Sequence, residues 1–399
     1  MKVWFVIQKL AGISGGAERI LVETANAMAS RGMNVTVITF ERRAGPPAYP
    51  LRGVALRNLF PFPAAATTEA RGGHGLEARI KAVPNVWPLP AAKFALTHGA
   101  FINRLRHALR RHRPDVVVGV MPPGILAAAD AAAPLGLPVI ASTHNLPEED
   151  FGNGARWDSN PIYRARCRAA LAKVRRVLVL QEAFRAWFGP AIATRVMVMP
   201  NPLPQPTAPL SPDRPPRIIA VGRLTDVKRV DLAIAAFAKV APRHPDWRFD
   251  VFGTGPEHDR LAAQIAATGL SDRIRLQGTT DQIMGEYARS ALMCHPARFE
   301  GFGLAVGEAL AHGVPVIADA DCPGVNALVR QGENGVLVHT APDPVAAFAE
   351  ALDQLMGDDA LRRSLAAVAP TSVADYAPSA IYDRWENVLR SCLSDDDLV

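Results

Sequence analysis

The stretch that most constrains the fold of this chain is NPLPQPTAPLSPDRPP, residues 201–216. Because proline fixes φ and lacks a backbone N–H, a run this rich in proline excludes a helix or a central strand and predicts a stiff, extended segment. On both sides of it, short apolar runs alternate with longer helical patterns. Such alternation is typical of parallel sheets covered by helices on both faces. We therefore predict an α/β protein with two doubly wound, Rossmann-like domains.

Several of the predicted strands are short, nearly continuous apolar runs, as expected for strands buried on both faces. They are residues 3–8, 34–40, 54–60, 115–120, 138–143, 177–181 and 195–200, then 217–222, 247–253, 273–278, 291–296, 314–319 and 335–340. We expect a first domain over 1–205, a linker over 206–216 and a second domain over 217–375. The helical pattern at 376–393 could pack back onto the first domain. Residues 61–95 predict loop, with one short helix at most.

Charge and cysteine content narrow the classes of function. Residues 1–205 carry 26 Lys+Arg against 12 Asp+Glu, whereas the remainder carries 18 against 26, so a basic half is joined to an acidic half. The four cysteines lack CxxC spacing, which disfavours a zinc site or a disulfide framework and fits a reducing cytoplasm. No apolar run approaches the ~18 residues of a membrane span. We expect a cytoplasmic protein that uses no cofactor and binds no nucleic acid.

Strand-to-helix loops carry the candidate site, because ligands of such sheets bind beyond the carboxyl ends of the strands. Gly15 and Gly16 precede a helix and leave its first N–H groups open to an anion, although the pattern is not GxGxxG and equally fits a tight turn. In the second domain, Arg223 and Lys228 flank another such loop and could clamp a diphosphate. The competing interpretation is a pair of solvated surface cations.

The segment FEGFGLAVGEALAHG, residues 299–313, contains two glutamates with seven residues between them. Gly301 and Gly303 allow a ligand to approach the backbone closely. Glu308 lies in an otherwise apolar helix, where it could accept hydrogen bonds from ribose hydroxyls, and Glu300 would face the other end of the ligand. A solvent-facing Glu308 is the competing interpretation.

Two further polar residues are ambiguous from the sequence. His144 ends a strand in ASTHN, where a single histidine is more often structural than catalytic. Asn201 follows the last strand of the first domain and is equally consistent with lining a cleft and with capping a turn.

These segments, with VGRLTDVKRVDLAIAAFAKV, FGTGPE, DCPGVNALVRQGENGVLV and SGGAERILVETANAMASRG, resemble the retaining glycosyltransferases of family four, which have the two-domain GT-B fold. The similarity covers nearly the whole chain and is densest over 217–340. It implies that Arg223 and Lys228 hold the donor diphosphate and that Glu308 binds the ribose. The residues that surround the transferred sugar are then Glu300, Gly301, Phe302, Gly303 and Leu304.

The resemblance also assigns roles in the first domain, where Gly15 and Gly16 would close over the phosphates and His144 would approach the donor sugar. Two departures stand out. Lys228-Arg229 replaces the usual Lys-Gly, and CPGVN, residues 322–326, replaces a loop that usually bears glycine or serine. These departures leave the turn at Arg229 and the contacts of the second loop open.

The activity implied is transfer of a hexose or hexosamine, with retention, from a nucleotide-diphosphate sugar to a hydroxyl of a glycan or lipid-linked acceptor, in bacterial surface polysaccharide or glycolipid synthesis. UDP is favoured over GDP as the donor nucleotide. We expect no metal, because the run that most resembles a DxD pair is the tail Asp395–Asp397. Three alternatives stay open: a nucleotide-sugar epimerase of the same architecture, a nucleotide-dependent oxidoreductase, disfavoured by the missing dinucleotide fingerprint, and a non-catalytic nucleotide-sugar-binding subunit.

The basic first domain contains a helical segment, RLRHALRRHR at 104–113, whose apolar stripe is explained by packing on the sheet. Packing does not explain the excess of arginine. A basic surface that faces an anionic membrane leaflet would explain it, and would place the protein at the inner face of the cell membrane as a peripheral enzyme.

Overall fold

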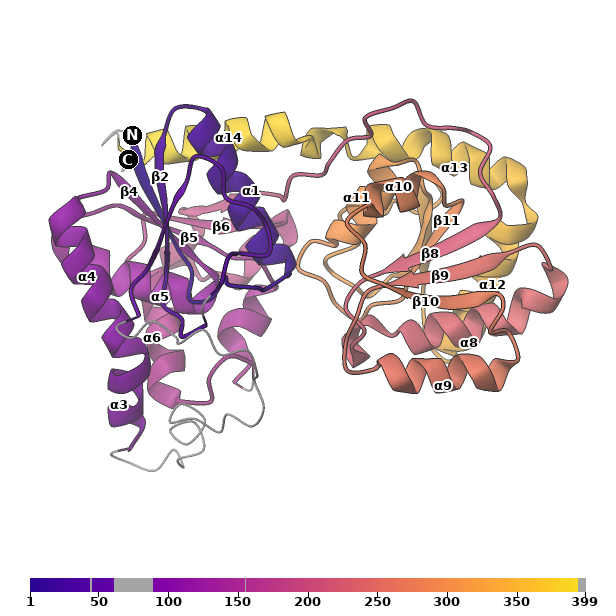
Figure 1. Ribbon diagram of the computed structural model, residues 1–399, viewed down its shortest axis with the longest axis horizontal. Coiled ribbons are helices and arrows are strands. Elements are labelled where there is room, and N and C mark those ends of the chain that lie inside the picture. Colours follow the sequence, from indigo (N-terminus) through magenta and orange to yellow (C-terminus); the bar gives the residue numbers. More distant parts are fainter. Residues whose placement is uncertain (44, 61–88, 155, 394–399) are drawn as a thin grey trace. The chain divides into compact units, whose positions relative to one another are not determined.

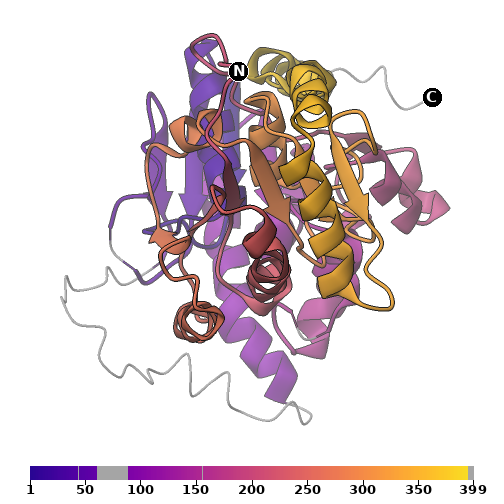
Figure 2. The ribbon, with the colours of Figure 1, turned by 90° about the vertical axis from the view of Figure 1, so that its right-hand side faces the viewer.

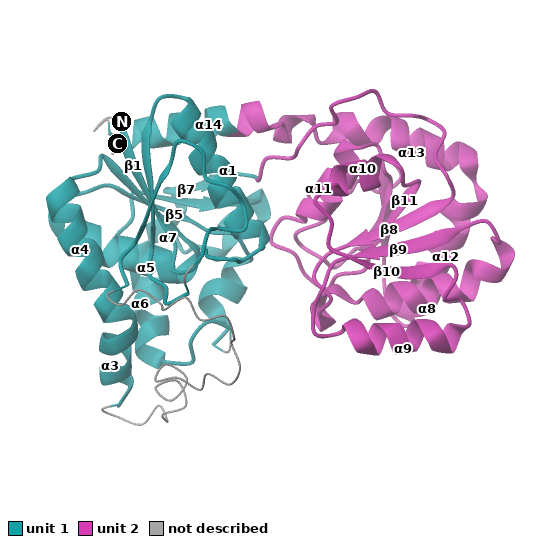
Figure 3. Cartoon of the chain, viewed as in Figure 1, with its two compact units in different colours: residues 1–200, 382–399 teal, residues 201–381 magenta. Residues whose placement is uncertain are grey.

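The computed structural model describes residues 1–43, 45–60, 89–154 and 156–393. Most of the 61–95 segment and the acidic tail at 395–397 therefore lie outside the described residues. The chain forms two compact units, residues 1–200 with 382–399 and residues 201–381 (Figure 3). Each unit is a parallel sheet with helices on both faces, which confirms the predicted fold class.

Seven parallel strands form the sheet of unit 1, in the order β3-β2-β1-β4-β5-β6-β7. Their bounds are β1 (Lys2–Val6), β2 (Asn34–Thr39), β3 (Ala55–Asn58), β4 (Val116–Val120), β5 (Val139–Ser142), β6 (Arg176–Val179) and β7 (Val196–Val198). The central strands are valine-rich and buried, as both-face burial requires. The order reverses between β1 and β4, and this reversal is the switch point of the sheet.

Helices cover both faces of the unit 1 sheet (Figure 1). Their bounds are α1 (Gly16–Ser30), α3 (Leu89–Phe94), the π-helical turn η1 (Ala95–Gly99), α4 (Ala100–His112), α5 (Met121–Ala132), α6 (Pro161–Leu171), α7 (Pro190–Ala193) and α14 (Pro378–Ser391). One face carries α4, α5 and α6, and the other carries α1 and α14. In unit 1, Arg31 at the end of α1 forms ion pairs with Asp383 (2.7 Å) and Glu386 (3.1 Å) of α14.

Six parallel strands form the sheet of unit 2, in the order β10-β9-β8-β11-β12-β13, with its switch point between β8 and β11. Their bounds are β8 (Arg217–Val221), β9 (Arg248–Phe252), β10 (Ile274–Gly278), β11 (Leu292–His295), β12 (Val316–Asp319) and β13 (Gly335–Val338). The helices are α8 (Val230–Val240), α9 (His258–Thr268), α10 (Ile283–Ala288), α11 (Leu304–Ala311), α12 (Pro344–Gly357) and α13 (Asp359–Ser372). Figures 1 and 2 show α8 beside α9 on one face, while α11 packs with α13 on the other.

The proline-rich stretch contains neither helix nor strand, as its composition predicts, but it packs as part of unit 2. Leu203 is fully buried, and its N–H donates to the carbonyl of Tyr376 (2.8 Å). Arg214 donates to the carbonyls of Ser290 (2.9 Å) and His312 (2.6 Å). A hydrogen-bonded segment therefore takes the place of the separate linker that we expected. Among the helices described, none is both long and apolar enough to cross a bilayer.

Candidate functional site

The residues predicted to hold the donor gather at the carboxyl edge of the unit 2 sheet. The loop after β8 carries Arg223 and Lys228, and the loop after β11 carries Glu300 and the two glycines that follow it. Because β8 and β11 are neighbours at the switch point, these loops leave the sheet side by side. The N–H of Arg298 donates to the carbonyl of Val227 (3.0 Å), which joins them. Residues about 75 positions apart in sequence thus form one surface.

Arg223 lies at the exposed tip of a rigid loop. The N–H of Leu224 donates to the carbonyl of Thr254 (2.9 Å), and a Cβ on Gly253 or on Gly255 would collide with the backbone of this loop. FGTGPE, quoted above for its resemblance, is therefore the support of the Arg223 loop. Neither an ion pair nor a hydrogen bond of the Arg223 guanidinium occurs among the described residues, so the backbone of the loop is fixed while the cation is not neutralised.

Lys228 differs from Arg223 because its ammonium forms an ion pair with Glu300 Oε1. The same oxygen lies 3.0 Å from Nε2 of His295, a buried residue at the end of β11. Burial alone would raise the pKa of Glu300, but the charge of Lys228 and the hydrogen bond from His295 lower that pKa to about 2. Glu300 is therefore an anion at neutral pH, with the Lys228 ammonium and the His295 imidazole beside the same oxygen. Sequence reasoning missed His295, although its place at a strand end five residues before Glu300 was a usable signal.

The loop after Glu300 presents backbone rather than side chains. Gly303 has φ +79°, a left-handed conformation that favours glycine, and it directly precedes α11. Phe302 was expected beside the sugar, but its ring is buried edge-on against Tyr376, 5.6 Å between ring centroids. Its side chain therefore packs in the core of unit 2, and its contribution to a ligand is limited to its backbone. A Cβ on Gly324 would collide with the backbone of Glu300, which explains the glycine of the CPGVN loop.

Glu308 is buried, with 3% of its surface exposed, so the solvent-facing interpretation is wrong. Its Oε2 accepts a hydrogen bond from the hydroxyl of Tyr287 (3.2 Å), a fully buried residue of α10. Burying a carboxyl group in an apolar helix is costly unless polar partners compensate it. Tyr287, which the sequence did not single out, provides such a partner and holds the Glu308 side chain in a fixed orientation.

Arg229 shows what the departure from Lys-Gly does to the turn. Its backbone is left-handed, φ +49° and ψ +40°, which explains why a glycine suits this position. The guanidinium reaches Asp319 Oδ2 (3.0 Å) at the end of β12, where 4% of the carboxylate side chain is exposed. An ion pair therefore accompanies a strained backbone, and Arg229 is a structural cation rather than a third member of the clamp.

We expect Arg229→Gly to lower the free energy of unfolding by about 1–2 kcal/mol. Relief of backbone strain contributes about 1 kcal/mol in favour of the variant. Removing the cation from a fully buried ion pair costs about 3 kcal/mol or more. The cost is smaller here because 17% of the Arg229 side chain is exposed. Urea denaturation measures the difference. Arg229→Gly combined with Asp319→Asn should recover most of the loss, and a single variant more stable than wild type would contradict the assignment.

In unit 1, the glycine pair lies where α1 begins, with Gly15 as the residue before the helix and Gly16 as its first member. A Cβ on Gly15 would collide with the carboxylate of Glu18, which therefore lies over the start of the helix. The helix start is open to an anion only when this side chain moves aside.

Glu41, just after β2, holds the loop that leads to this glycine pair. Its carboxylate accepts hydrogen bonds from the N–H groups of Leu10 (3.0 Å) and Ala11 (3.1 and 3.2 Å), and it is buried. In dinucleotide-binding folds an acidic residue at this place in the fold binds a ribose. Here the carboxylate is engaged by the protein's own backbone, which disfavours the oxidoreductase interpretation.

His144 lies just after β5, and its Nε2 is 3.1 Å from the hydroxyl of Ser142. Burial lowers the pKa of His144 to about 4, so the imidazole is neutral at pH 7. Its buried Nδ1 has no hydrogen-bond partner among the described residues. A buried polar atom of this kind calls for a partner, and this favours a binding role that the sequence left open.

Asp150, six residues further on, is a second titratable group that sequence reasoning did not select. Its Oδ1 accepts a hydrogen bond from Trp157 Nε1 (3.1 Å), and burial raises the pKa of Asp150 to about 7 despite this bond. The loop after β5 thus holds a neutral histidine beside a carboxyl group that titrates near neutrality. Asn201 is buried and belongs to unit 2.

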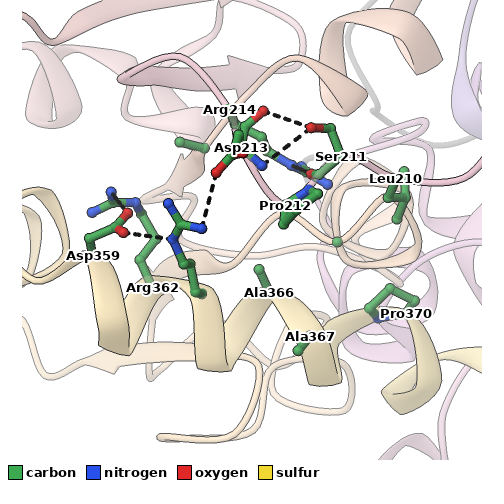
Figure 4. A pocket seen from close by; sticks show the side chains of 13 residues that line it. Leu210, Ser211, Pro212, Asp213, Arg214, Asp359, Arg362, Ala366, Ala367 and Pro370 are labelled. Atoms are coloured by element: carbon green, nitrogen blue, oxygen red, sulfur yellow. Dashed lines mark hydrogen bonds and ion pairs between the residues drawn. The ribbon is translucent and has the colours of Figure 1, made fainter.

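A cavity of about 330 Å³ lies at the opposite, amino-terminal edge of the unit 2 sheet, between α13 and the residues before β8 (Figure 4). Its arginines are engaged by protein acceptors: Arg363 pairs with Asp213 (3.0 Å) and Asp359 (2.6 Å), and Arg214 is bound to backbone carbonyls. This edge carries no residue of the candidate site, and its charges are satisfied, so we assign the cavity no part in it.

Comparison with known proteins shows which family of proteins this chain resembles. Residues 14–204 match the family model "Glycosyltransferase Family 4", and residues 205–371 match "Glycosyl transferases group 1". An exopolysaccharide phosphotransferase of Streptomyces coelicolor is 34% identical over 297 residues, 73% of this chain but only 30% of that protein. An uncharacterized glycosyltransferase of Haemophilus influenzae is 24% identical over 97% of this chain and 99% of its own. The crystal structure of HepE from Anabaena with UDP and glucose superposes with a TM-score of 0.71, at 19% identity, covering 98% of this chain and all of that chain.

Proposed function

Since the chain belongs to the family-four glycosyltransferases of the GT-B fold, we propose that it transfers a hexose or hexosamine, with retention, from a UDP-sugar to a hydroxyl of a glycan or lipid-linked acceptor. The observation that carries the proposal is the group of charges at the switch point of unit 2. Arg223 is an uncompensated cation, and Lys228 and His295 together orient the carboxylate of Glu300. Cations at the carboxyl edge of a parallel sheet suit a diphosphate.

The chemistry assigned to these residues is stabilisation of a leaving group. The bond between the sugar C1 and the diphosphate oxygen breaks, and a bond from C1 to the acceptor oxygen forms on the same face. The acceptor proton passes to the departing phosphate oxygen. Arg223, Lys228 and the N–H groups at the start of α11 supply the charge that stabilises the diphosphate as it leaves. His144, being neutral, would donate a hydrogen bond to the sugar or accept one from it, and it would not repel an oxocarbenium-like centre.

Synthesis of bacterial surface polysaccharide is the setting that we propose. The Streptomyces relative is named for an exopolysaccharide, but this chain spans less than a third of it, and we transfer no phosphotransferase activity. The choice of UDP is supported by the UDP complex of the structural neighbour. A mass-spectrometric depletion screen with UDP- and GDP-sugars tests both choices. Transfer would be supported if one UDP-sugar were consumed when an acceptor is present and not otherwise. Consumption of GDP-sugars but of no UDP-sugar would overturn the choice of UDP.

The same screen separates the competing functions. An epimerase would convert a UDP-sugar into its isomer with no acceptor present, at constant mass and with a changed retention time. A non-catalytic subunit would bind UDP but leave every donor intact. An oxidoreductase would change the absorbance of a nicotinamide cofactor, and the engagement of Glu41 by its own backbone argues against that outcome.

We also propose that the basic surface of unit 1 binds an anionic membrane. In α4 the residues Phe101, Leu105 and Leu109 are buried, while Arg104, Arg110 and Arg111 are exposed. Arg106, which we first grouped with them, is instead directed inward and donates to the carbonyl of Asp130 (2.8 Å). The exposed arginines are therefore the ones available to lipid.

We expect the triple variant with glutamate at 104, 110 and 111 to bind anionic vesicles at least roughly a hundredfold more weakly, because each basic residue contributes about 1 kcal/mol. Sedimentation with phosphatidylglycerol and phosphatidylcholine vesicles measures this, and added salt should reduce binding. The charge-matched control carries glutamate at exposed positions 248, 275 and 298 of unit 2. Equal loss in both variants, or no binding by wild type at low salt, would contradict the assignment.

A further inference from the structure

A groove of about 470 Å³ lies in unit 1 between the helical run α3–η1–α4 and α6, a volume within the ~300–1,000 Å³ range of ligand sites. Figure 1 shows α3 and α4 as one column beside α6. The groove begins at the carboxyl edge of the sheet, because α4 runs back toward β4 and α6 begins where the β5 loop ends. Its lining residues are Ala91, Phe94, Ala95, Gly99, Ile102, Asn103, Arg106, Ile162 and Arg166.

One wall of this groove is apolar and made of small residues. Ala91, Ala95 and Gly99 line it from the helical run, and Ile102 and Ile162 close it from the two sides. On the same run, Leu89 and Leu96 are 42% and 66% exposed. A wall of small apolar residues, on a helical run that also carries exposed leucines, suits a hydrocarbon chain.

Two of the three polar residues that line the groove are arginines, and the third is Asn103, which accepts a hydrogen bond from Arg106 (3.2 Å). Arg166 pairs with the buried Asp130 (2.7 and 3.1 Å), but Lys173 takes the other oxygen of that carboxylate (2.6 Å). Arg106 reaches the backbone carbonyl of Asp130, and its buried Nε has no hydrogen-bond partner among the described residues. None of the described lining residues is acidic. Arg166 and Lys173 thus share the Asp130 carboxylate, while Arg106 bonds only the backbone carbonyl of that residue, so the groove carries a surplus of positive charge.

We propose that this groove binds an amphiphilic anion, a hydrocarbon chain that ends in a phosphate, with the chain along Ala91, Ala95 and Gly99 and the phosphate at Arg106 and Arg166. The Arg166 guanidinium lies 4.9 Å from the centre of the Phe94 ring, which holds it over the groove. This identification rests on the proposed function: the occupant is the lipid part of a lipid-linked acceptor. The groove would then select the carrier, while the residues of the carboxyl edge select the sugar.

Calorimetry of the full chain with decyl phosphate, below its micelle concentration, tests the proposal. Wild type should bind it saturably, with affinity rising roughly fourfold for each methylene added between octyl and decyl. Gly99→Leu fills the groove, and a Cβ at Gly99 meets only ordinary contacts, the nearest at 3.5 Å. We expect this variant and Arg166→Gln to bind at least tenfold more weakly. Arg52→Gln, a matched change at an exposed arginine outside the groove, should bind as wild type does.

Four results would overturn the proposal. Wild type could show no saturable binding of decyl phosphate, or both groove variants could bind it as tightly as wild type does. Wild type could also bind neutral decyl maltoside, or inorganic phosphate, as tightly as it binds decyl phosphate. The last two would mean a plain apolar groove and a plain anion site. UDP binding and transfer to a short water-soluble acceptor should survive Gly99→Leu, so a failure of the lipid site is distinguishable from a failure of the transferase assignment. Arg166→Gln keeps the test decisive if Gly99→Leu does not fold.

Discussion

Replacing Arg223 by alanine is expected to lower kcat of sugar transfer by roughly 10²–10³-fold, the usual effect of removing one preorganised charged donor from a transition state. The side chain is exposed at the tip of a loop whose backbone is held by Thr254 and two glycines. Since it forms no ion pair among the described residues, its removal should change the free energy of unfolding by less than about 0.5 kcal/mol. Steady-state kinetics and urea denaturation measure the two quantities.

Arg298→Ala is the matched control for this variant. Arg298 lies on the neighbouring loop, is exposed, and has an exposed partner, Asp226 (3.2 Å). If Arg298→Ala were as slow as Arg223→Ala, general positive charge rather than a positioned guanidinium would explain the loss. A turnover within about threefold of wild type for Arg223→Ala would remove Arg223 from the clamp altogether.

Lys228 is a less clean test than the sequence suggested. From the sequence, Lys228 and Arg223 were equivalent members of a diphosphate clamp on one loop. Lys228 is instead the charge that keeps the half-buried Glu300 ionised. Its removal leaves a carboxylate without a cation, so stability and turnover should fall together. Arg223→Ala is therefore the cleaner test of the diphosphate clamp.

The central strands were predictable, because strands buried on both faces of a parallel sheet are apolar throughout, whereas the edge strands β3 and β10 are exposed or partly exposed and were predicted from the alternation with helices. Arg223, Lys228 and Glu300 were selected because they are charged residues in loops that follow strands, and Glu308 because it is a carboxylate in an apolar helix. The structure brings the first three to neighbouring loops and places Glu308 in the helix that follows. The sequence did not predict the partners of these residues on other elements. Tyr287 orients Glu308, and Asp319 pairs with Arg229, but a partner on a distant helix or strand leaves no signal in the local sequence.

Side-chain direction was the other quantity that the sequence could not supply. Phe302 stands between two glycines of a candidate sugar loop, yet its ring packs on Tyr376. Arg106 stands among exposed arginines, yet it is directed toward Asp130. The proline-rich stretch lacks regular structure as expected, but the burial of Leu203 makes it part of unit 2. In each case tertiary packing decided between two orientations that local composition allows equally.

Glu308→Gln is expected to weaken binding of UDP by about tenfold or more, since a hydrogen bond to a charged group contributes about 1.5–3 kcal/mol. Glutamine keeps the shape of the side chain and an oxygen for the Tyr287 hydroxyl, so folding should be nearly unchanged. Calorimetry with 2′,3′-dideoxy-UDP identifies the partner. Wild type should bind this analogue about as weakly as the variant binds UDP, and the variant should lose little more when it is given the analogue.

Tyr287→Phe separates the ribose contact from the packing around it. This variant removes the hydroxyl that donates to Glu308 but leaves the carboxyl group in place, so UDP affinity should fall by less than in Glu308→Gln. If Tyr287→Phe weakened UDP as much as Glu308→Gln does, the effect would come from disturbing the buried pair. If the variant and wild type lost equal affinity on passing from UDP to the dideoxy analogue, Glu308 would have no energetic coupling to the ribose hydroxyls, and its assignment as their acceptor would be wrong.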